Sequence, residues 1–274
     1  MKSPSPSYRD EIVLFTTTLY KDDETSKVRQ ELALKLFENA KALGIRCVVV
    51  DGKSNPDFLS KAAAFDNVVL TTMEEGSMGD GRREALREAL ALGAPNVMWI
   101  EPEKDALVTA ENIERILAPL RKGEADIVVP KRTREGFHSL PKLQEWMEKR
   151  ANKRAARLVR ESSGAEDAAI DQTWDLWFGP KAMNREGARY FETYRGKLDK
   201  WDAIIKPVHD AFRDGKKVAS VAVDYVYDES QKENEEHNRG MKLKRIDQYV
   251  NILKELGDHF WIEKTKEGKE PKMR

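Results

Sequence analysis

The chain has 274 residues, the size of one large domain or two small ones, and 40% of them are hydrophobic, enough for a sizeable core. Its 48 Lys and Arg residues equal its 48 Asp and Glu residues, which argues against a global affinity for polyanions such as nucleic acid. No stretch reaches the ~20 apolar residues of a membrane span, and the first residues lack the apolar core of a signal peptide. We therefore expect a soluble, cytoplasmic protein. The single cysteine, Cys47, lies in an apolar run and is expected to be a buried structural thiol.

The first half of the chain alternates between strand and helix patterns. The β-branched and aromatic run at 11–20 is typical of a strand, whereas Leu32, Leu36, Ala40 and Leu43 recur at helical spacing before a glycine. Ser77 and Asp80 have the spacing of a capping box at the start of a helix. Predicted strands cover 11–20, 45–52, 67–72, 96–100 and 125–133, and predicted helices cover 26–44, 77–93 and 109–123.

This alternation with short connections predicts βαβ units and a mainly parallel, twisted sheet flanked by helices, an α/β fold. In open sheets of this kind, ligands bind beyond the carboxyl ends of the strands. The polar residues predicted at these ends are Thr16–Thr18, Asp51, Thr71–Gly76 and Glu101–Asp105.

The second half is predicted to contain a helix at 143–161, a helix within 201–212, a strand at 217–228 and a helix at 244–257. No linker separates the halves, so we expect a single domain with an elaborated C-terminal half. The predicted division is a flexible N-terminus at 1–10, a first half at 11–135, a second half of the same domain at 136–262 and a flexible tail at 263–274.

Several known motifs are missing. No GxxxxGK[ST] loop occurs, and no GxGxxG follows the first strand, which argues against a P-loop NTPase and a dinucleotide-binding domain. The four histidines form no close pair, so no zinc signature is present. A GxSxG motif is absent as well.

Three carboxylates, Glu101, Glu103 and Asp105, follow the apolar strand at 96–100. Because they alternate, at least two could point to one site in an extended loop. Hard cations such as Mg²⁺ or Mn²⁺ prefer one or two carboxylates together with substrate phosphates. The alternative is a solvated acidic turn, and the spacing alone leaves both interpretations open.

The stretch from "VVVDGKS" to "WIEPEKDAL" resembles the nucleotide-binding half of a GT-A glycosyltransferase of the family-2-like kind. The resemblance covers 11–135, and 171–212 is similar, more weakly, to the acceptor half. It therefore implies a nucleotide-sugar-binding half at 11–135 and an acceptor half at 136–262. It implies that Asp51 reads the nucleobase. It also implies that Glu101-Pro102-Glu103 takes the place of a DxD signature that holds Mn²⁺ or Mg²⁺ and the donor diphosphate, with Glu103 the main ligand. Asp105 is a third candidate metal ligand, because the EPE triplet departs from DxD.

Transfer of this kind needs charge neutralised on the leaving diphosphate and a carboxylate to deprotonate the acceptor. Arg82, Arg83, Lys131 and Arg132 are candidates for the first task, with Thr16 as a further donor-binding residue. The alternative for Arg82 and Arg83 is a solvated helix face, and the alternative for Lys131 and Arg132 is an ordinary loop. Asp202, after Trp201, is the first candidate base and Asp175 the second. His209 is a candidate late metal ligand, with His237 as its alternative.

Two further features have competing explanations. Trp174 and Trp177 could stack on a sugar, although core packing is favoured. The helix at 146–160 could face an acidic acceptor, RNA or a membrane surface, but a solvated face is favoured. Its basic residues are Lys149, Arg150, Lys153, Arg154, Arg157 and Arg160.

The sequence therefore predicts a glycosyltransferase that moves a sugar from a nucleotide diphosphate sugar to an unknown acceptor, with a divalent cation. Nucleic acid is not an expected partner. A non-catalytic GT-A-like scaffold and a nucleotidyltransferase are the alternatives. The second is disfavoured because "TTTLYKDD" contains no phosphate-binding glycine.

Overall fold

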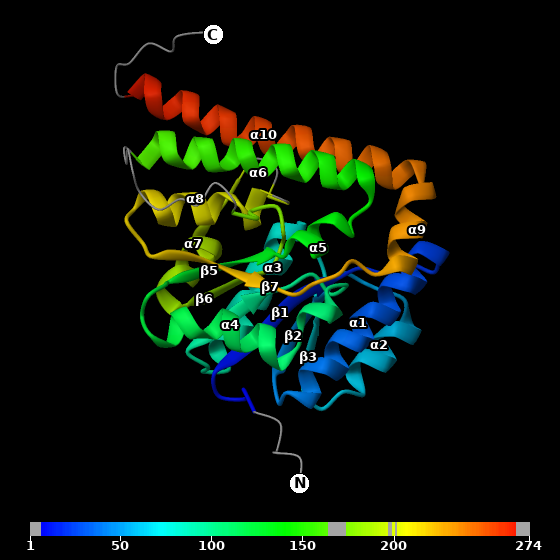
Figure 1. Ribbon diagram of the computed structural model, residues 1–274. Coiled ribbons are helices and arrows are strands. Elements are labelled where there is room, and N and C mark those ends of the chain that lie inside the picture. Colours follow the sequence, from blue (N-terminus) through cyan, green and yellow to red (C-terminus); the bar gives the residue numbers. More distant parts are fainter. Residues whose placement is uncertain (1–6, 164–173, 197–198, 201, 267–274) are drawn as a thin grey trace.

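The computed structural model describes residues 7–163, 174–196, 199–200 and 202–266. Within them, seven strands form one sheet in the order β3-β2-β1-β4-β6-β5-β7 (Figure 1). The strands are β1 (Ile12–Thr18), β2 (Arg46–Asp51), β3 (Val68–Thr72), β4 (Asn96–Trp99), β5 (Ile127–Arg132), β6 (Lys181–Asn184) and β7 (Val218–Val223). All neighbouring pairs are parallel except those of β6, which runs antiparallel to β4 and β5. The predicted α/β fold with a mainly parallel sheet is confirmed.

Helices cover both faces of the sheet. They are α1 (Glu24–Ala42), α2 (Pro56–Ala63), α3 (Met78–Ala91), α4 (Ala110–Arg121), α5 (Arg134–His138), α6 (Lys142–Ser163), α7 (Arg185–Thr193), α8 (Lys206–Arg213), α9 (Glu229–His237) and α10 (Arg239–Lys266). Short 3₁₀ helices lie at Asp105–Leu107 and Asp202–Ile204. Figure 1 shows α6 and α10 side by side across one end of the molecule, and the two helices contact each other.

The core lies on both sides of the sheet because alternate residues of each strand point to opposite faces. Ile12 and Leu14 of β1 pack in one buried cluster with residues of α1 and α4. Val13 and Phe15 pack in the other with residues of α3, α7 and α8. Cys47 is buried, as predicted, and burial raises the pKa of its thiol to about 12. No helix in the described part of the chain is long and apolar enough to cross a membrane.

The start of α3 confirms the predicted capping box. The backbone N–H of Asp80 donates to the Ser77 hydroxyl at 3.1 Å, and the Ser77 N–H donates to the Asp80 carboxylate at 3.0 Å. Two of the four exposed N–H groups of the first turn region are thereby bonded locally. This fixes the direction in which α3 leaves the edge of the sheet.

The elements differ from the predicted ones mainly in the second half. The strand β6 and the helix α7 occupy a segment to which no element was assigned. The strand predicted at 217–228 ends at Val223, and an irregular segment continues to α9. The last helix begins at Arg239 and reaches Lys266, so it includes the first residues of the predicted tail at 263–274.

Candidate active site

A cavity of about 450 Å³ lies at the carboxyl edge of the sheet, within the usual range for small-molecule sites. Its floor comes from the end of β1 at Thr17 and Thr18, the turn after β2 at Gly52, the turn after β4 at 101–104, and Arg132 of β5. The first turns of α3 and residues from α6, α9 and α10 complete the wall. The cavity is therefore where a parallel sheet places its ligands, and the C-terminal half closes it.

Glu101 follows β4 and carries a buried carboxylate oxygen, Oε2, without a hydrogen-bond partner among the described residues. Its carboxylate packs against Gly179, where an added Cβ would overlap Oε1. Nearly all buried polar atoms in folded proteins have a partner, so an unpaired carboxylate oxygen in a cavity wall indicates a ligand. Among the predicted site residues, Glu101 is therefore the strongest candidate for binding a ligand.

The charge of Glu101 acts on three cationic side chains, Arg82, Lys104 and Lys181. Arg82 of α3 stacks over Trp99, with its guanidinium carbon 4.9 Å from the ring centroid, and burial lowers its pKa to about 10 against the attraction of Glu101. Burial lowers the pKa of Lys181 to about 8, although Glu101 acts in the opposite direction. Lys104 also experiences the charge of Glu101. The site is therefore rich in positive charge around one carboxylate.

Lys104 lies in an aromatic enclosure. Its ammonium is 4.9 Å from the ring centroids of Tyr225 and Tyr227 and 5.8 Å from that of Phe178. It also donates to the Tyr225 hydroxyl at 3.2 Å. These contacts hold the charge of Lys104 at the cavity wall.

Glu103 is bound within the protein. Its Oε1 atom lies 2.6 Å from the Arg29 guanidinium and accepts a hydrogen bond from the Tyr20 hydroxyl at 3.2 Å. Burial and the Glu103 charge raise the pKa of Tyr20 well above its ordinary value, so the hydroxyl stays a donor. Although Glu103 lines the cavity, Arg29 already balances its charge.

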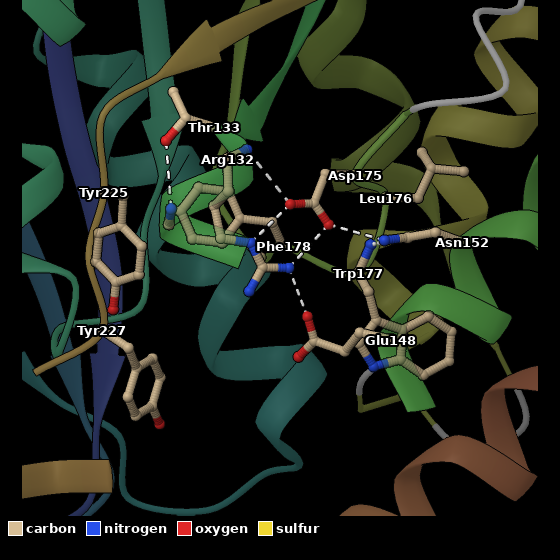
Figure 2. Close-up of polar contacts among 12 residues, drawn as sticks. Arg132, Thr133, Glu148, Asn152, Asp175, Leu176, Trp177, Phe178, Tyr225 and Tyr227 are labelled. Carbon is tan, nitrogen blue, oxygen red and sulfur yellow. Dashed lines mark hydrogen bonds and ion pairs between the residues drawn. The ribbon is translucent and has the colours of Figure 1, made fainter. Parts of the chain in front are cut away.

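Arg132 is the centre of a buried network, drawn in Figure 2. Its guanidinium binds both oxygens of Asp175, with Nε to Oδ2 at 2.6 Å and Nη2 to Oδ1 at 2.8 Å, and Nη2 also donates to Glu148 at 2.5 Å. The side-chain amide of Asn152 donates to Oδ1 of Asp175 at 2.8 Å. The Arg132 guanidinium also lies over the ring of Phe178, 4.7 Å from its centroid.

This network explains why Asp175 stays ionised although it is buried. Burial alone would raise its pKa, but Arg132 and the donated hydrogen bonds lower it. Arg132 and Glu148 line the cavity, whereas Asp175 is not among the described lining residues. The structure thus brings Asp175 and Arg132 together as a buried ion pair, a pairing that the sequence did not predict.

Two predicted donor-binding residues lie just behind the cavity wall. The Asp51 carboxylate is buried and accepts from the Thr18 hydroxyl at 2.6 Å and from the Ser54 N–H at 2.6 Å. Thr16 is buried, and its hydroxyl oxygen has no partner within the described residues. Neither residue is among the described lining residues, whereas Thr17 and Gly52 are.

Arg83 and Lys131 also point away from the cavity. Arg83 is buried and forms ion pairs at 2.6 Å with Asp199 and Asp80. Lys131 precedes Arg132 on β5, so the alternation of the strand directs it to the opposite face. Of the four predicted cations, Arg82 and Arg132 reach the cavity wall.

The remaining predicted residues lie outside the lining. Asp105 begins a 3₁₀ helix, and burial raises its pKa. His209 is buried on α8, with Nδ1 3.4 Å from an oxygen of Asp210. Asp202 is buried and accepts hydrogen bonds from the Tyr194 hydroxyl at 2.7 Å and the Lys200 N–H at 2.9 Å. Trp201 lies outside the described residues.

Of the tryptophans, Trp177 lines the cavity, and Trp174 packs in the core against Phe212, with ring centroids 5.8 Å apart. His237 lines a second cavity of about 450 Å³ between the start of α6, the end of α9 and the start of α10. The two cavities share Gln144, Glu235, Met241 and Arg245.

Several cavity residues lie far apart in the chain and were not predicted from the sequence. They are Tyr20, Arg29, Lys104, Gln144, Glu148, Phe178, Gly179, Tyr227, Glu235 and Arg245. One local signal was available, because Tyr225 and Tyr227 alternate and hence can face the same side. The long-range ion pairs offer no such pattern.

The side chains of the cavity wall offer few ligands for a divalent cation. No group of three or more His, Cys, Asp or Glu side chains in the described chain is arranged to hold a metal. Magnesium sites in enzymes, however, use one or two carboxylates plus substrate phosphates. The unpaired oxygen of Glu101 would supply one such ligand, whereas Glu103 is bound to Arg29, and Asp105 and His209 lie outside the lining.

The sequence matches no protein-family model and no curated protein. The fold, in contrast, is similar to that of solved structures of glucosyl-3-phosphoglycerate synthase from Mycobacterium tuberculosis. One, in complex with Mn²⁺, UDP-glucose and phosphoglyceric acid, aligns with a TM-score of 0.55 and 14% identity over 90% of this chain and 80% of that one. The protein has a GT-A-like glycosyltransferase fold.

Two other structures of the same synthase support this GT-A assignment. A complex with Mn²⁺, UDP and glucosyl-3-phosphoglycerate aligns with a TM-score of 0.54 and 11% identity over 89% of this chain and 80% of that one. A complex with Mg²⁺ and UDP aligns with a TM-score of 0.51 and 13% identity over 89% and 79%. At such identities the likeness establishes the GT-A fold, and the chemistry has to be argued from this chain's own residues.

Proposed function

We propose that the protein transfers a sugar from a nucleotide diphosphate sugar to an acceptor. The observation that carries this proposal is the unpaired, buried carboxylate oxygen of Glu101 among Arg82, Lys104 and Lys181, in a cavity at the carboxyl edge of a GT-A sheet. One of the similar structures holds UDP-glucose with Mn²⁺, which supports a nucleotide sugar as the donor.

The leaving nucleoside diphosphate gains negative charge as the glycosidic bond breaks, so the site must stabilise that charge. Arg82 and Lys104 present positive charge at the cavity wall and are held there by stacking on Trp99 and by the aromatic enclosure of Lys104. A divalent cation bound to the diphosphate would add to this charge as a Lewis acid.

We assign the carboxylate that would hold this cation to Glu101. The sequence pattern favoured Glu103, the last acid of the EPE triplet. In the folded chain Glu103 is paired with Arg29 at 2.6 Å, whereas Glu101 keeps an oxygen without a partner. Glu103 would then fix the loop by binding Arg29 and Tyr20, and Pro102 would keep the two carboxylates apart.

For the acceptor's proton we keep Asp202 as the first candidate base and Asp175 as the second. Asp202 accepts hydrogen bonds from a hydroxyl and a backbone N–H, both neutral groups, and its charge acts on Arg82. Asp175, in contrast, is bound by the Arg132 guanidinium through both oxygens. A carboxylate stabilised in this way is a weaker base.

The proposal is tested by thermal unfolding with UDP and with GDP, each with Mn²⁺ and with a chelator, followed by incubation with the matching radiolabelled nucleotide sugar. A ligand at 100 times its Kd stabilises a protein by about 2.7 kcal/mol, so binding should raise the melting temperature clearly. Release of sugar from the donor would then establish the chemistry. Binding without any sugar release, to water or to acceptor mixtures, would favour a non-catalytic scaffold. The absence of binding would remove the main support for the proposal.

A further inference from the structure

The exposed surface of α6 has an unusual composition. Over Lys142–Arg157, where the structure describes the side chains, every exposed residue is basic or apolar. The apolar ones are Leu143 and Trp146, and the basic ones are Lys142, Lys149, Arg150, Lys153, Arg154 and Arg157. The acids of this segment are used internally, since Glu148 is buried against Arg132 and Glu145 lies 2.7 Å from His138.

The neighbouring helix α10 exposes large apolar side chains. Leu243 is 57% exposed, Ile246 45% and Val250 54%, and their spacing of three and four residues places them on one face of the helix. Trp146 of α6 is 52% exposed, and the Arg150 guanidinium lies 4.3 Å from its ring centroid. We call the surface formed by these exposed residues the α6/α10 face. Its two helices contact each other and lie side by side in Figure 1.

Overall composition does not explain this face. The chain as a whole has a formal net charge of zero, so six exposed bases without an exposed acid on the described part of α6 are a local segregation of charge. A face adapted only to water would need neither this segregation nor exposed Trp, Leu, Ile and Val side chains beside it. Basic residues combined with exposed apolar side chains are the composition of helices that lie on anionic membrane surfaces.

Charge decides between the possible occupants. A second copy of the chain would bring the bases of two α6 helices together, and like charges repel. Nucleic acid would match the bases but would leave Leu243, Ile246 and Val250 in water, because phosphate backbones offer no apolar surface. An anionic lipid surface satisfies both groups, since lipid head groups attract Lys and Arg and the boundary with the acyl chains accepts apolar side chains.

We propose that the α6/α10 face binds the protein peripherally to an anionic lipid surface. The contact is electrostatic through α6 and apolar through Trp146 and the exposed residues of α10. It requires no transmembrane segment, and it does not depend on the proposed transferase activity.

The test is co-sedimentation of the full chain with vesicles of phosphatidylcholine alone or with one third phosphatidylglycerol, at low salt and at 0.5 M NaCl. We expect binding to the anionic vesicles only, and weakening by salt. Each base near such a surface contributes about fivefold in affinity, so the double variant Lys153→Glu/Arg157→Glu should bind at least about 25-fold more weakly. Leu243→Ser/Val250→Ser should also bind more weakly, because it removes the apolar part of the contact.

The matched control is Lys122→Glu/Lys61→Glu, which makes the same charge change at exposed residues of α4's end and α2. It should bind like the unmodified protein, and unchanged melting temperatures will show that all variants are folded. Failure of the unmodified protein to bind anionic vesicles overturns the proposal, and so does equal weakening in the control. If no vesicles bind and the protein is an oligomer that the Leu243→Ser/Val250→Ser variant dissociates, the occupant is a second copy of the chain. If no vesicles bind and the protein binds a single-stranded oligonucleotide that only the Lys153→Glu/Arg157→Glu variant fails to bind, the occupant is nucleic acid.

Discussion

Two groups of buried charge lie at the carboxyl edge of the sheet, and they differ in how completely their polar atoms are bonded. Around Arg132, both oxygens of Asp175 and an oxygen of Glu148 accept hydrogen bonds from the guanidinium. Around Glu101, the carboxylate oxygen Oε2, the Arg82 Nε and the indole nitrogen of Trp99 have no partner within the described chain.

The difference separates structure from ligand binding. A buried ion pair that is hydrogen-bonded within the protein needs no ligand to balance its charges, and it fixes the positions of the elements that carry it. A buried polar group without a partner is costly unless something else supplies one. The first group therefore holds the floor of the cavity in place, and the second is the place where a ligand would be bound.

The largest effect is expected from breaking the Arg132 network. Asp175→Asn leaves the buried guanidinium with less than its full countercharge, and loss of one partner of a buried pair costs about 3–5 kcal/mol. Urea denaturation should show this loss in the free energy of unfolding. A variant that keeps its stability but loses sugar transfer would instead identify Asp175 as the catalytic base.

A smaller effect concerns Lys181, which is buried and donates to the carbonyl oxygens of Leu176, Phe178 and Gly179. Its pKa is lowered to about 8 by burial, from an ordinary value of 10.5. Above pH 8 the unfolded chain thus binds more protons at this residue than the folded chain, so the contribution of Lys181 to stability rises with pH, by up to about 1.4 kcal/mol per unit.

This contribution is measured as the difference between the unmodified protein and Lys181→Met. Their free energies of unfolding should diverge between pH 8 and 10, with the unmodified protein gaining. At higher pH the raised pKa of Tyr20, Tyr225 and Tyr227 lowers the stability of both proteins, because the unfolded chain ionises first, and this effect cancels in the difference. Parallel curves over pH 8–10 would show that burial does not depress the Lys181 pKa.

A still smaller change is expected for Gly179→Ala. The added Cβ would overlap the Glu101 carboxylate, which is the end of a flexible side chain and can move away. We therefore expect a loss of stability of about 1 kcal/mol, within the common range for single substitutions, and a loss of UDP affinity in the presence of Mn²⁺ of about tenfold. Calorimetric titration checks the affinity, and unchanged binding would mean that the position of Glu101 is unimportant to the ligand.

The regular part of the molecule could be predicted from the sequence because its signals are local. Apolar periodicity and the Ser77 cap predicted the βαβ half, and the carboxyl-end rule located the cavity at Thr17, Thr18 and Glu101. The strand β6 was missed because it has four residues and pairs antiparallel with strands far away in the chain.

The hydrogen-bond and ion-pair partners of the predicted site residues could not be predicted from the sequence in this way. The sequence pattern favoured Glu103 over Glu101, but the packing of α1 brings Arg29 to Glu103. Likewise, Asp175 and Arg132 were both predicted as site residues, but their pairing joins positions 43 residues apart. Long-range pairing of charges thus decided which carboxylate kept a free oxygen.

The most direct test of this account is calorimetric titration of UDP into the unmodified protein, Glu101→Gln and Glu103→Gln, with Mn²⁺ and with a chelator. Loss of a charged contact costs about 1–3 kcal/mol, so Glu101→Gln should lose most of the affinity that Mn²⁺ adds, roughly 5–150-fold. Glu103→Gln should retain more of it, because its charge is balanced by Arg29. Equal affinities in the unmodified protein and Glu101→Gln, or a larger loss in Glu103→Gln, would contradict the assignment of Glu101 as the carboxylate that binds the ligand.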